Sequence, residues 1–129
     1  MKLDCKQISI SDDDLGCQVT FHEKEQLGEE TAKMSVREII DSIGRYLLLQ
    51  RTYSEIDFGK NNYYFETHDE NLSGELEAFE IVMSRQSFEL QFDSEKIEIS
   101  INPTDKEYSD LMHVIPIIID KRGRLTING

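Results

Sequence analysis

The densest group of chemically active side chains in the sequence is Glu66, His68, Asp69 and Glu70. An imidazole beside carboxylates offers ligand types that suit a divalent metal ion. A tight transition-metal site needs a second imidazole or a thiolate, however, and a calcium loop needs acids that alternate through a fixed frame with a central glycine. Because this stretch shows neither pattern, we interpret it as a charged turn and expect no metal and no cofactor.

Glu80 and Glu98 are a second candidate, because a pair of carboxylates on one face is the arrangement that glycosidases use. About two strand spacings, roughly 10 Å, would separate them, and a flat solvated face would not raise the pKa of a general acid. A glycine-rich phosphate loop, Cys-x-x-Cys, His-Glu-x-x-His and Gly-x-Ser-x-Gly are all missing from the sequence. We therefore expect no enzymatic activity, with a small hydrolase of unrecognised type as the alternative.

Strands must position these carboxylates, since hydrophobic residues recur at every second position between residues 78 and 102. This period predicts an antiparallel meander with one dry face and one wet face. Two four-residue connections would close the hairpins and place Leu90 opposite Ile81 on one side and Ile99 on the other. The strands are predicted at Phe79–Met83, Phe88–Phe92 and Ile97–Ile101.

Two amphipathic helices are predicted from capping residues followed by apolar side chains at helical spacing. Ser35 precedes the first helix, Val36–Ile43. Thr104 precedes the second, which begins at Asp105 and which Pro116 would end. Since the dry face of the meander needs a cover, we expect these helices to supply it.

The expected fold is a single α+β domain over residues 1–129. Its antiparallel β-sheet would combine the meander at residues 78–102 with N-terminal strands, and two short helices would cover one face. A small hairpin is expected after Pro116. The N-terminal strands are predicted at Leu3–Ile10, Cys17–His22, Tyr46–Arg51 and Tyr63–Thr67. Cys5 and Cys17 are expected to be thiols and not a disulfide.

Charge excludes several partners, because 26 Asp and Glu against 14 Lys and Arg give a net charge of -12. A chain this anionic is repelled by nucleic-acid phosphates and by acidic membranes. The N-terminus carries charges where a signal peptide needs an apolar stretch, so a cytoplasmic location is expected. The acidic surplus is concentrated in residues 66–110, which hold 13 acids and 3 bases, a net charge of -10.

This regional charge has two readings. It could serve solubility, since any small domain benefits from net charge. It could also be a docking surface for a basic protein, because charge of one sign steers association. The candidate partner-binding residues are the acids Glu66, Asp69, Glu70, Glu80, Glu89 and Glu98, with Tyr63 and Tyr64 as aromatic anchors.

Two segments followed by the meander resemble the immunity protein 10 family of bacterial polymorphic toxin systems. The segments are Arg45–Arg51 (Arg-Tyr-Leu-Leu-Leu-Gln-Arg) and Asn62–Glu66 (Asn-Tyr-Tyr-Phe-Glu). The similarity runs from about Ile43 to about Ile115 and rests on the order of features. The turn at His68–Gly74 departs from the shorter sequence expected of the family.

The resemblance implies a cytosolic protein that neutralises a cognate toxin by binding it, as immunity proteins of contact-dependent growth inhibition do. Many such toxins are nucleases with basic substrate grooves, which an acidic surface would complement. Such a protein would act as a monomer or a weak homodimer. The alternative is an adaptor or chaperone-like acidic binding module for a secreted effector, which would tolerate several partners.

Overall fold

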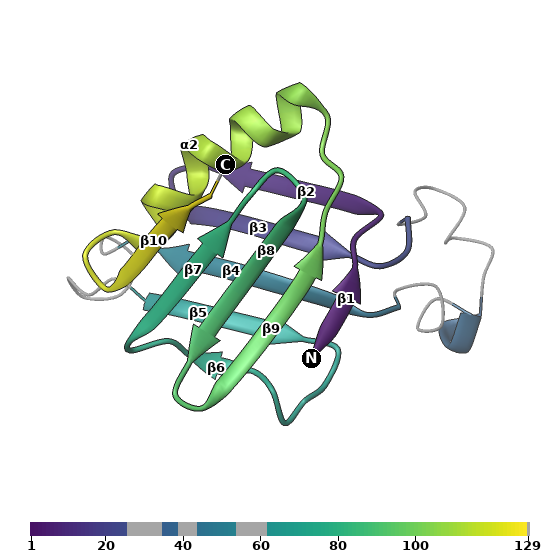
Figure 1. The fold of residues 1–129 in the computed structure, drawn as a ribbon. Coiled ribbons are helices and arrows are strands. Elements are labelled where there is room, and N and C mark those ends of the chain that lie inside the picture. The colour runs from purple at the N-terminus through teal and green to yellow at the C-terminus, as the bar shows by residue number, and fades with distance from the viewer. Residues whose placement is uncertain (26–34, 39–43, 54–61, 129) are drawn as a thin grey trace.

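Two five-stranded sheets lie face to face in the computed structural model, which describes residues 1–25, 35–38, 44–53 and 62–128. In Figure 1 the strands of the front sheet, sheet A, run across those of the rear sheet, sheet B. Sheet A has the order β1-β9-β8-β7-β10, and sheet B has the order β2-β3-β4-β5-β6. The elements are β1 (Lys2–Asp4), β2 (Gln7–Asp12), β3 (Gly16–His22), β4 (Tyr46–Thr52), β5 (Asn62–Thr67), β6 (Gly74–Glu75), β7 (Phe79–Met83), β8 (Ser87–Phe92), β9 (Glu95–Ser100), α2 (Asp105–Ile119) and β10 (Gly123–Ile127).

Sheet B is antiparallel throughout, and each strand pairs with the next one along the chain. Its register places Val19 opposite Leu49 and Leu49 opposite Phe65, all of them buried. Side chains alternate between the two faces of a strand, so the intervening residues of β3, β4 and β5 face outward. Sheet B therefore has one apolar face toward sheet A and one outer face.

The predicted meander is present in sheet A, with Ile81 opposite Leu90 as expected. The second hairpin is tighter than expected, because Phe92 pairs with Glu95 and leaves a connection of two residues. Asp93 in this turn has a φ of 50°, the left-handed conformation that such a tight hairpin turn requires. As a result Leu90 faces Ile97 and not Ile99, which shifts every pair between β8 and β9.

Both edges of sheet A are parallel strands from outside the meander. β1 pairs with β9, and β10 pairs with β7. The small C-terminal hairpin predicted after Pro116 is therefore wrong, since the residues before the Lys121 turn are helical and β10 joins the meander instead.

Helix α2 continues through Pro116 to Ile119, although the proline was expected to end it. Proline removes only its own N–H, which would have bonded to the carbonyl of Met112. Pro116 and Met112 lie on the exposed side of the helix, where water can satisfy that carbonyl. Ile118 and Ile119, by contrast, are buried, so their apolar contacts favour the additional turn.

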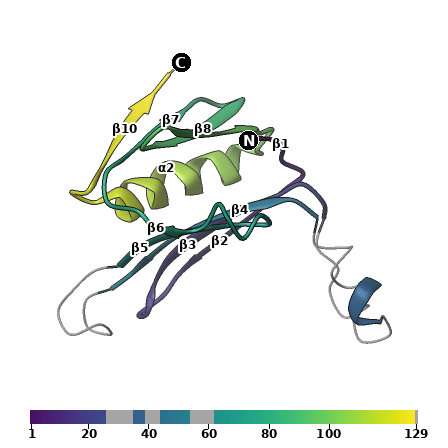
Figure 2. The ribbon, with the colours of Figure 1, turned by 90° about the horizontal axis from the view of Figure 1, so that it is seen from below.

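The α+β composition with mostly antiparallel strands is confirmed, but the cover of one face by two helices is not confirmed in the part of the chain that the structure describes. The dry face of the meander packs against sheet B, with the rings of Phe21 and Phe88 at 4.5 Å and those of Phe65 and Phe92 at 4.6 Å. Figure 2 shows α2 between the two sheets, and it contacts β2, β3, β4 and β10. A second sheet thus supplies most of the cover that was expected from helices.

The first predicted helix is described only at residues 36–38, which are helical, and residues 39–43 lie outside the described part. The Ser35 hydroxyl accepts the Glu38 N–H at 3.2 Å and donates to the Glu38 carboxylate at 3.1 Å. Val36, expected on the apolar side, is 75% exposed. In Figure 1 this turn lies beyond β1 and away from both sheets.

Other expectations concern cysteines and membranes. Cys5 and Cys17 are free thiols, as expected, and Cys17 is completely buried. No helix in the described ranges is long and apolar enough to cross a membrane.

Substitution of Phe88 tests the face-to-face packing of the sheets. Phe88→Ala should lower the free energy of unfolding by about 3 to 5 kcal/mol, because it removes a buried ring and leaves a cavity between the sheets. Gln91→Ala on the outer side of the same strand should stay within about 0.5 kcal/mol of the parent. Urea unfolding of the three proteins measures the difference. Equal losses for the two variants would contradict the inward orientation of Phe88.

Candidate binding surface

The candidate partner-binding residues divide between the two outer faces of the sandwich, which point in opposite directions. Glu80, Glu89 and Glu98 lie on the outer face of sheet A. Glu66 and Tyr64 lie on the outer face of sheet B, and the turn after β5 carries Asp69 and Glu70. Tyr63, the neighbour of Tyr64, points inward and is 6% exposed, so it belongs to the core and not to an accessible surface. The predicted residues therefore do not form one site.

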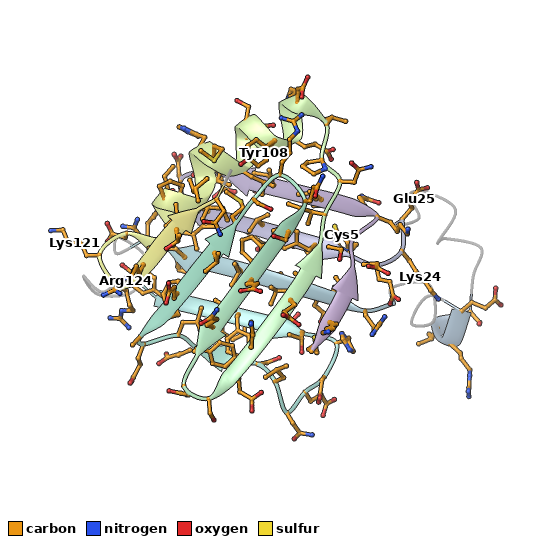
Figure 3. All side chains as sticks on the ribbon, in the orientation of Figure 1. Cys5, Lys24, Glu25, Tyr108, Lys121 and Arg124 are labelled. Atoms are coloured by element: carbon orange, nitrogen blue, oxygen red, sulfur yellow. The ribbon has the colours of Figure 1, made fainter. Side chains whose placement is uncertain are left out.

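The outer face of sheet A mixes both signs of charge. Lys96 lies 3.6 Å from Glu89 and 3.5 Å from Glu98. Lys2, which β1 brings into register with Glu98, lies 3.8 Å from it. On the other edge, β10 places Arg124 opposite Glu80, and Figure 3 shows Arg124 with Lys121 at that edge of the sheet. Acidic residues on this face are thus interleaved with cations.

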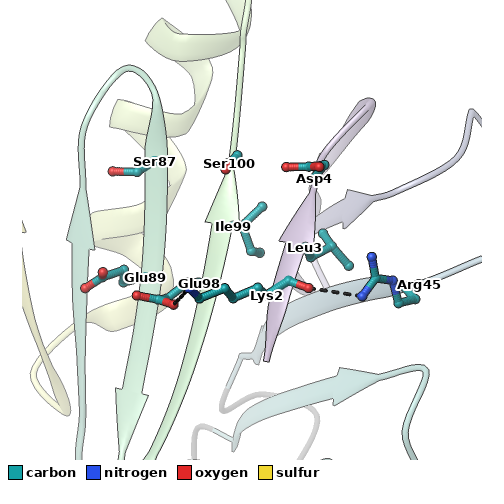
Figure 4. Close-up of a pocket in the computed structure, with 9 residues that line it drawn as sticks. All are labelled: Lys2, Leu3, Asp4, Arg45, Ser87, Glu89, Glu98, Ile99 and Ser100. Carbon is teal, nitrogen blue, oxygen red and sulfur yellow. Dashed lines mark hydrogen bonds and ion pairs between the residues drawn. The ribbon is translucent and has the colours of Figure 1, made fainter.

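A cavity of about 560 Å³ opens at the β1 edge of sheet A, between Lys2, Glu98 and Arg45 (Figure 4). Lys2, Glu98 and Arg45 already have partners. Arg45 donates to both carboxylate oxygens of Glu23 at 2.8 Å and to the Lys2 carbonyl at 3.2 Å. The hydrogen bond from Arg45 lowers the pKa of Glu23 to about 2. These pairs tie β1 to the start of β4, which is a structural role.

The outer face of sheet B centres on Glu66, which is half-buried and accepts hydrogen bonds from two tyrosines. The Tyr46 hydroxyl donates to Oε2 at 2.8 Å, and the Tyr64 hydroxyl donates to Oε1 at 3.4 Å. Leu48 pairs directly with Glu66, and Glu75 pairs with Tyr64. Burial, together with the hydrogen bond to Glu66, raises the pKa of Tyr46 to about 12. Tyr46 therefore remains a protonated donor at neutral pH.

This face differs from that of sheet A in its lack of lysine and arginine. The register assigns serine, threonine, glutamine, histidine, tyrosine, leucine and glutamate to the outer positions, and no lysine or arginine appears among those that the structure describes. Glu66 and Glu75 form no ion pair within the described ranges. This surface therefore presents negative charge that no described ion pair neutralises, next to two tyrosines, to a binding partner.

The turn that carries Asp69 and Glu70 is built around Thr67, whose side chain is buried. Its hydroxyl accepts the Asp69 N–H at 3.1 Å and lies 2.8 Å from the Leu72 carbonyl. Asp69 uses one carboxylate oxygen to accept the Asn71 N–H at 3.0 Å. Asp69 and Glu70 are exposed, and they extend the acidic surface of sheet B at the end of β5.

His68 takes part in the backbone structure. Its Nδ1 accepts the N–H of Tyr46 at 3.2 Å, which fixes the proton of a neutral ring on Nε2. Glu66 accepts from tyrosine hydroxyls, His68 from a backbone N–H and Asp69 from an N–H of its own turn, so these three of the four residues first considered as metal ligands have separate donors. In the ranges described, no group of three His, Cys, Asp or Glu side chains could hold a metal ion.

A polar network that the sequence did not indicate joins α2 to sheet B. Arg51 donates to the Ile117 carbonyl at 2.6 Å and lies 3.5 Å from Asp120, which follows the helix. The Tyr63 hydroxyl donates to Asp120 at 2.9 Å, and Arg122 stacks on the Tyr63 ring at 4.5 Å. Arg51 thereby supplies the positive charge that favours a helix C-terminus. We assign this network to stability.

The comparisons with known proteins leave function to be inferred from these side chains. The chain matches no protein-family model, no curated protein and no solved structure. The uncompensated outer face of sheet B and the neutralised outer face of sheet A are therefore the observations from which function must be argued.

Removal of the Tyr63 hydroxyl tests the Asp120 network. The hydrogen bond from Tyr63 lowers the pKa of Asp120, so it stabilises the fold above the ordinary carboxyl pKa, and this contribution is lost as the pH falls. Tyr63→Phe should lower the free energy of unfolding by about 1 kcal/mol at neutral pH. This value is reduced because Asp120 is partly exposed to solvent. The cost should shrink near pH 3, where the carboxyl begins to protonate in both proteins.

Urea unfolding at the two pH values measures this difference. Tyr108→Phe is the control, since the Tyr108 ring lies beside Arg85 on the other end of α2. Its effect should not change with pH in this range. A Tyr63→Phe cost that is the same at both pH values would contradict a role for Asp120 as the charged acceptor.

Proposed function

We propose that this protein is an immunity protein, which binds one cognate bacterial toxin domain in the cytosol and neutralises it in a stoichiometric complex. It would perform no turnover and need no cofactor. The two segments that resemble the immunity protein 10 family support the proposal, because they are neighbours in the fold. Arg45–Arg51 lies largely in β4 and Asn62–Glu66 in β5, and these strands pair antiparallel. Together they supply Tyr46, Tyr64 and Glu66.

The observation that carries the proposal is the outer face of sheet B, where no lysine or arginine occupies a described position beside Glu66 and Glu75. Aromatic side chains are enriched where proteins bind each other tightly, and the negative charge would attract a basic partner and raise its association rate. The outer face of sheet A would attract a basic partner less strongly, because its acidic residues lie beside Lys2, Lys96 and Arg124.

A basic nuclease is the partner that this chemistry favours. Its substrate groove must attract phosphates, so a surface of fixed carboxylates would compete for the same basic side chains. The inhibitor would cover the groove itself or a basic flank beside it, and either position would block entry of the nucleic acid. The strong negative charge of the chain as a whole would add to the attraction at long range.

Co-expression with a panel of bacterial toxin domains, including any that is encoded beside this chain, tests the function. The protein should restore growth against a single toxin and form a one-to-one complex with it. An adaptor or chaperone-like module would instead bind several effectors with similar affinity. Protection against none of the toxins, including any encoded beside this chain, would contradict the proposal.

Charge reversal on each face locates the binding surface. Glu66→Lys with Glu75→Lys should slow association with the toxin about tenfold or more at low salt and flatten its salt dependence. Glu89→Lys with Glu98→Lys is the matched variant on sheet A, and it should change the association rate by no more than about threefold, because cations already screen that face. Stopped-flow mixing at several salt concentrations gives both rates, after circular dichroism has shown that each variant is folded. The reverse ranking would assign binding to sheet A.

A further inference from the structure

Glu66 is held in place by two tyrosines and can accept further hydrogen bonds. Each of its carboxylate oxygens receives one hydrogen bond from a tyrosine, at 2.8 Å from Tyr46 and 3.4 Å from Tyr64. A carboxylate has about four lone-pair positions, so both oxygens retain capacity for a further donor. Because the tyrosines come from neighbouring strands, the carboxylate plane is fixed by the sheet and need not be ordered when a partner binds.

Three other half-buried carboxylates form ion pairs with a cation, whereas Glu66 forms none within the described ranges. Glu23 is paired with Arg45, and Glu89 and Glu98 share Lys96. No lysine or arginine lies within ion-pair distance of Glu66 in the ranges that the structure describes. A half-buried charge costs desolvation energy, which pairing with a cation offsets. Within the described part of the chain, only two neutral tyrosine hydroxyl groups offset the desolvation energy of Glu66. A cation from a partner would offset more of it.

The surroundings favour a guanidinium group over an ammonium group. Two fixed oxygens match the parallel N–H groups of arginine, which bind a carboxylate in a two-pronged manner. Aromatic rings of Tyr46 and Tyr64 lie beside the carboxylate, and Leu48, opposite Glu66 on β4, adds an apolar surface. Planar, weakly hydrated guanidinium packs on such groups, whereas the ammonium of lysine is a compact and strongly hydrated charge.

We propose that Glu66, Tyr46 and Tyr64 form a receptor for an arginine side chain that the toxin presents. The inference rests on the proposed function, for which it names the chemistry of the central contact. Arginine from a substrate groove would be withdrawn from nucleic-acid phosphates when it binds Glu66. The remaining acids of the outer face of sheet B, including Glu75, would steer the toxin without selecting between arginine and lysine.

A titration with model side chains tests the receptor without any toxin. N-acetyl-arginine amide and N-acetyl-lysine amide are added separately to ¹⁵N-labelled protein at constant ionic strength, and amide chemical shifts are followed. The arginine derivative should shift the signals of Tyr46, Tyr64 and Glu66 in a saturable manner, with a dissociation constant on the order of tens of millimolar for one exposed contact. The lysine derivative should bind at least about threefold more weakly.

Matched variants identify the group responsible. Glu66→Gln keeps the shape of the side chain and should weaken arginine binding about tenfold, since it removes the charge. Tyr46→Phe and Tyr64→Phe should weaken it less, because they release the carboxylate without neutralising it. Glu75→Gln, on the same face, and Glu89→Gln, on the other sheet, should leave arginine binding unchanged.

Each alternative outcome overturns the receptor. Equal binding of the two derivatives would reduce the face to a general acidic surface, and shifts spread over the molecule or retained in Glu66→Gln would place arginine binding elsewhere. These results would leave the immunity function standing, since growth protection is measured independently. Selective arginine binding without protection against any toxin would retain the receptor and overturn the immunity function.

Discussion

The contact between the two sheets is the constraint on which the other features depend. Each sheet has one apolar face, and ring pairs such as Phe21 with Phe88 close the gap between them. Apolar burial of this kind is the dominant favourable term in folding. Once both dry faces are used against each other, the charged residues must lie on two outer faces that point away from each other. No single surface can then present the whole acidic surplus, and the two faces must be judged separately.

Hydrophobic period predicted most strands but not their partners. The single strand predicted at Leu3–Ile10 is wrong, because the strand breaks at Cys5 and divides into β1 and β2, which belong to different sheets. Alternation at residues 78–102 predicted the meander and its inward side chains, because a slip by one residue would turn every apolar side chain outward. The pairing of Ile81 with Leu90 followed from the length of the first connection. A slip by two residues keeps the alternation, and this is why the two-residue turn at Asp93 was missed. The spacing of hydrophobic residues also does not show whether a helix or another sheet covers the apolar face of a sheet. The final turn of α2 beyond Pro116 depended on burial of Ile118 and Ile119, which local sequence does not show.

The candidate surface was only partly predictable for a related reason. Counting charge along residues 66–110 gave a strong surplus, but the cations that reduce it on sheet A include Lys2 and Arg124, which come from remote strands. Strict alternation was enough to show that Tyr63 and Tyr64 cannot both face outward, and burial of Phe65 with Tyr63 follows from the same rule. Tyr46 was present in the Arg45–Arg51 segment, yet its place beside Glu66 required the pairing of β4 with β5.

Solubility alone does not account for the outer face of sheet B. A charge that serves solubility works best where water surrounds it, as at the exposed turn residues Asp69 and Glu70. Glu66 is instead half-buried within a strand, where desolvation opposes the charge and two tyrosine hydroxyls are needed to hold it. Proteins depart from the arrangement that favours their own stability mainly at functional sites. Glu66 therefore occupies a position that solubility does not explain and that a basic partner would complement.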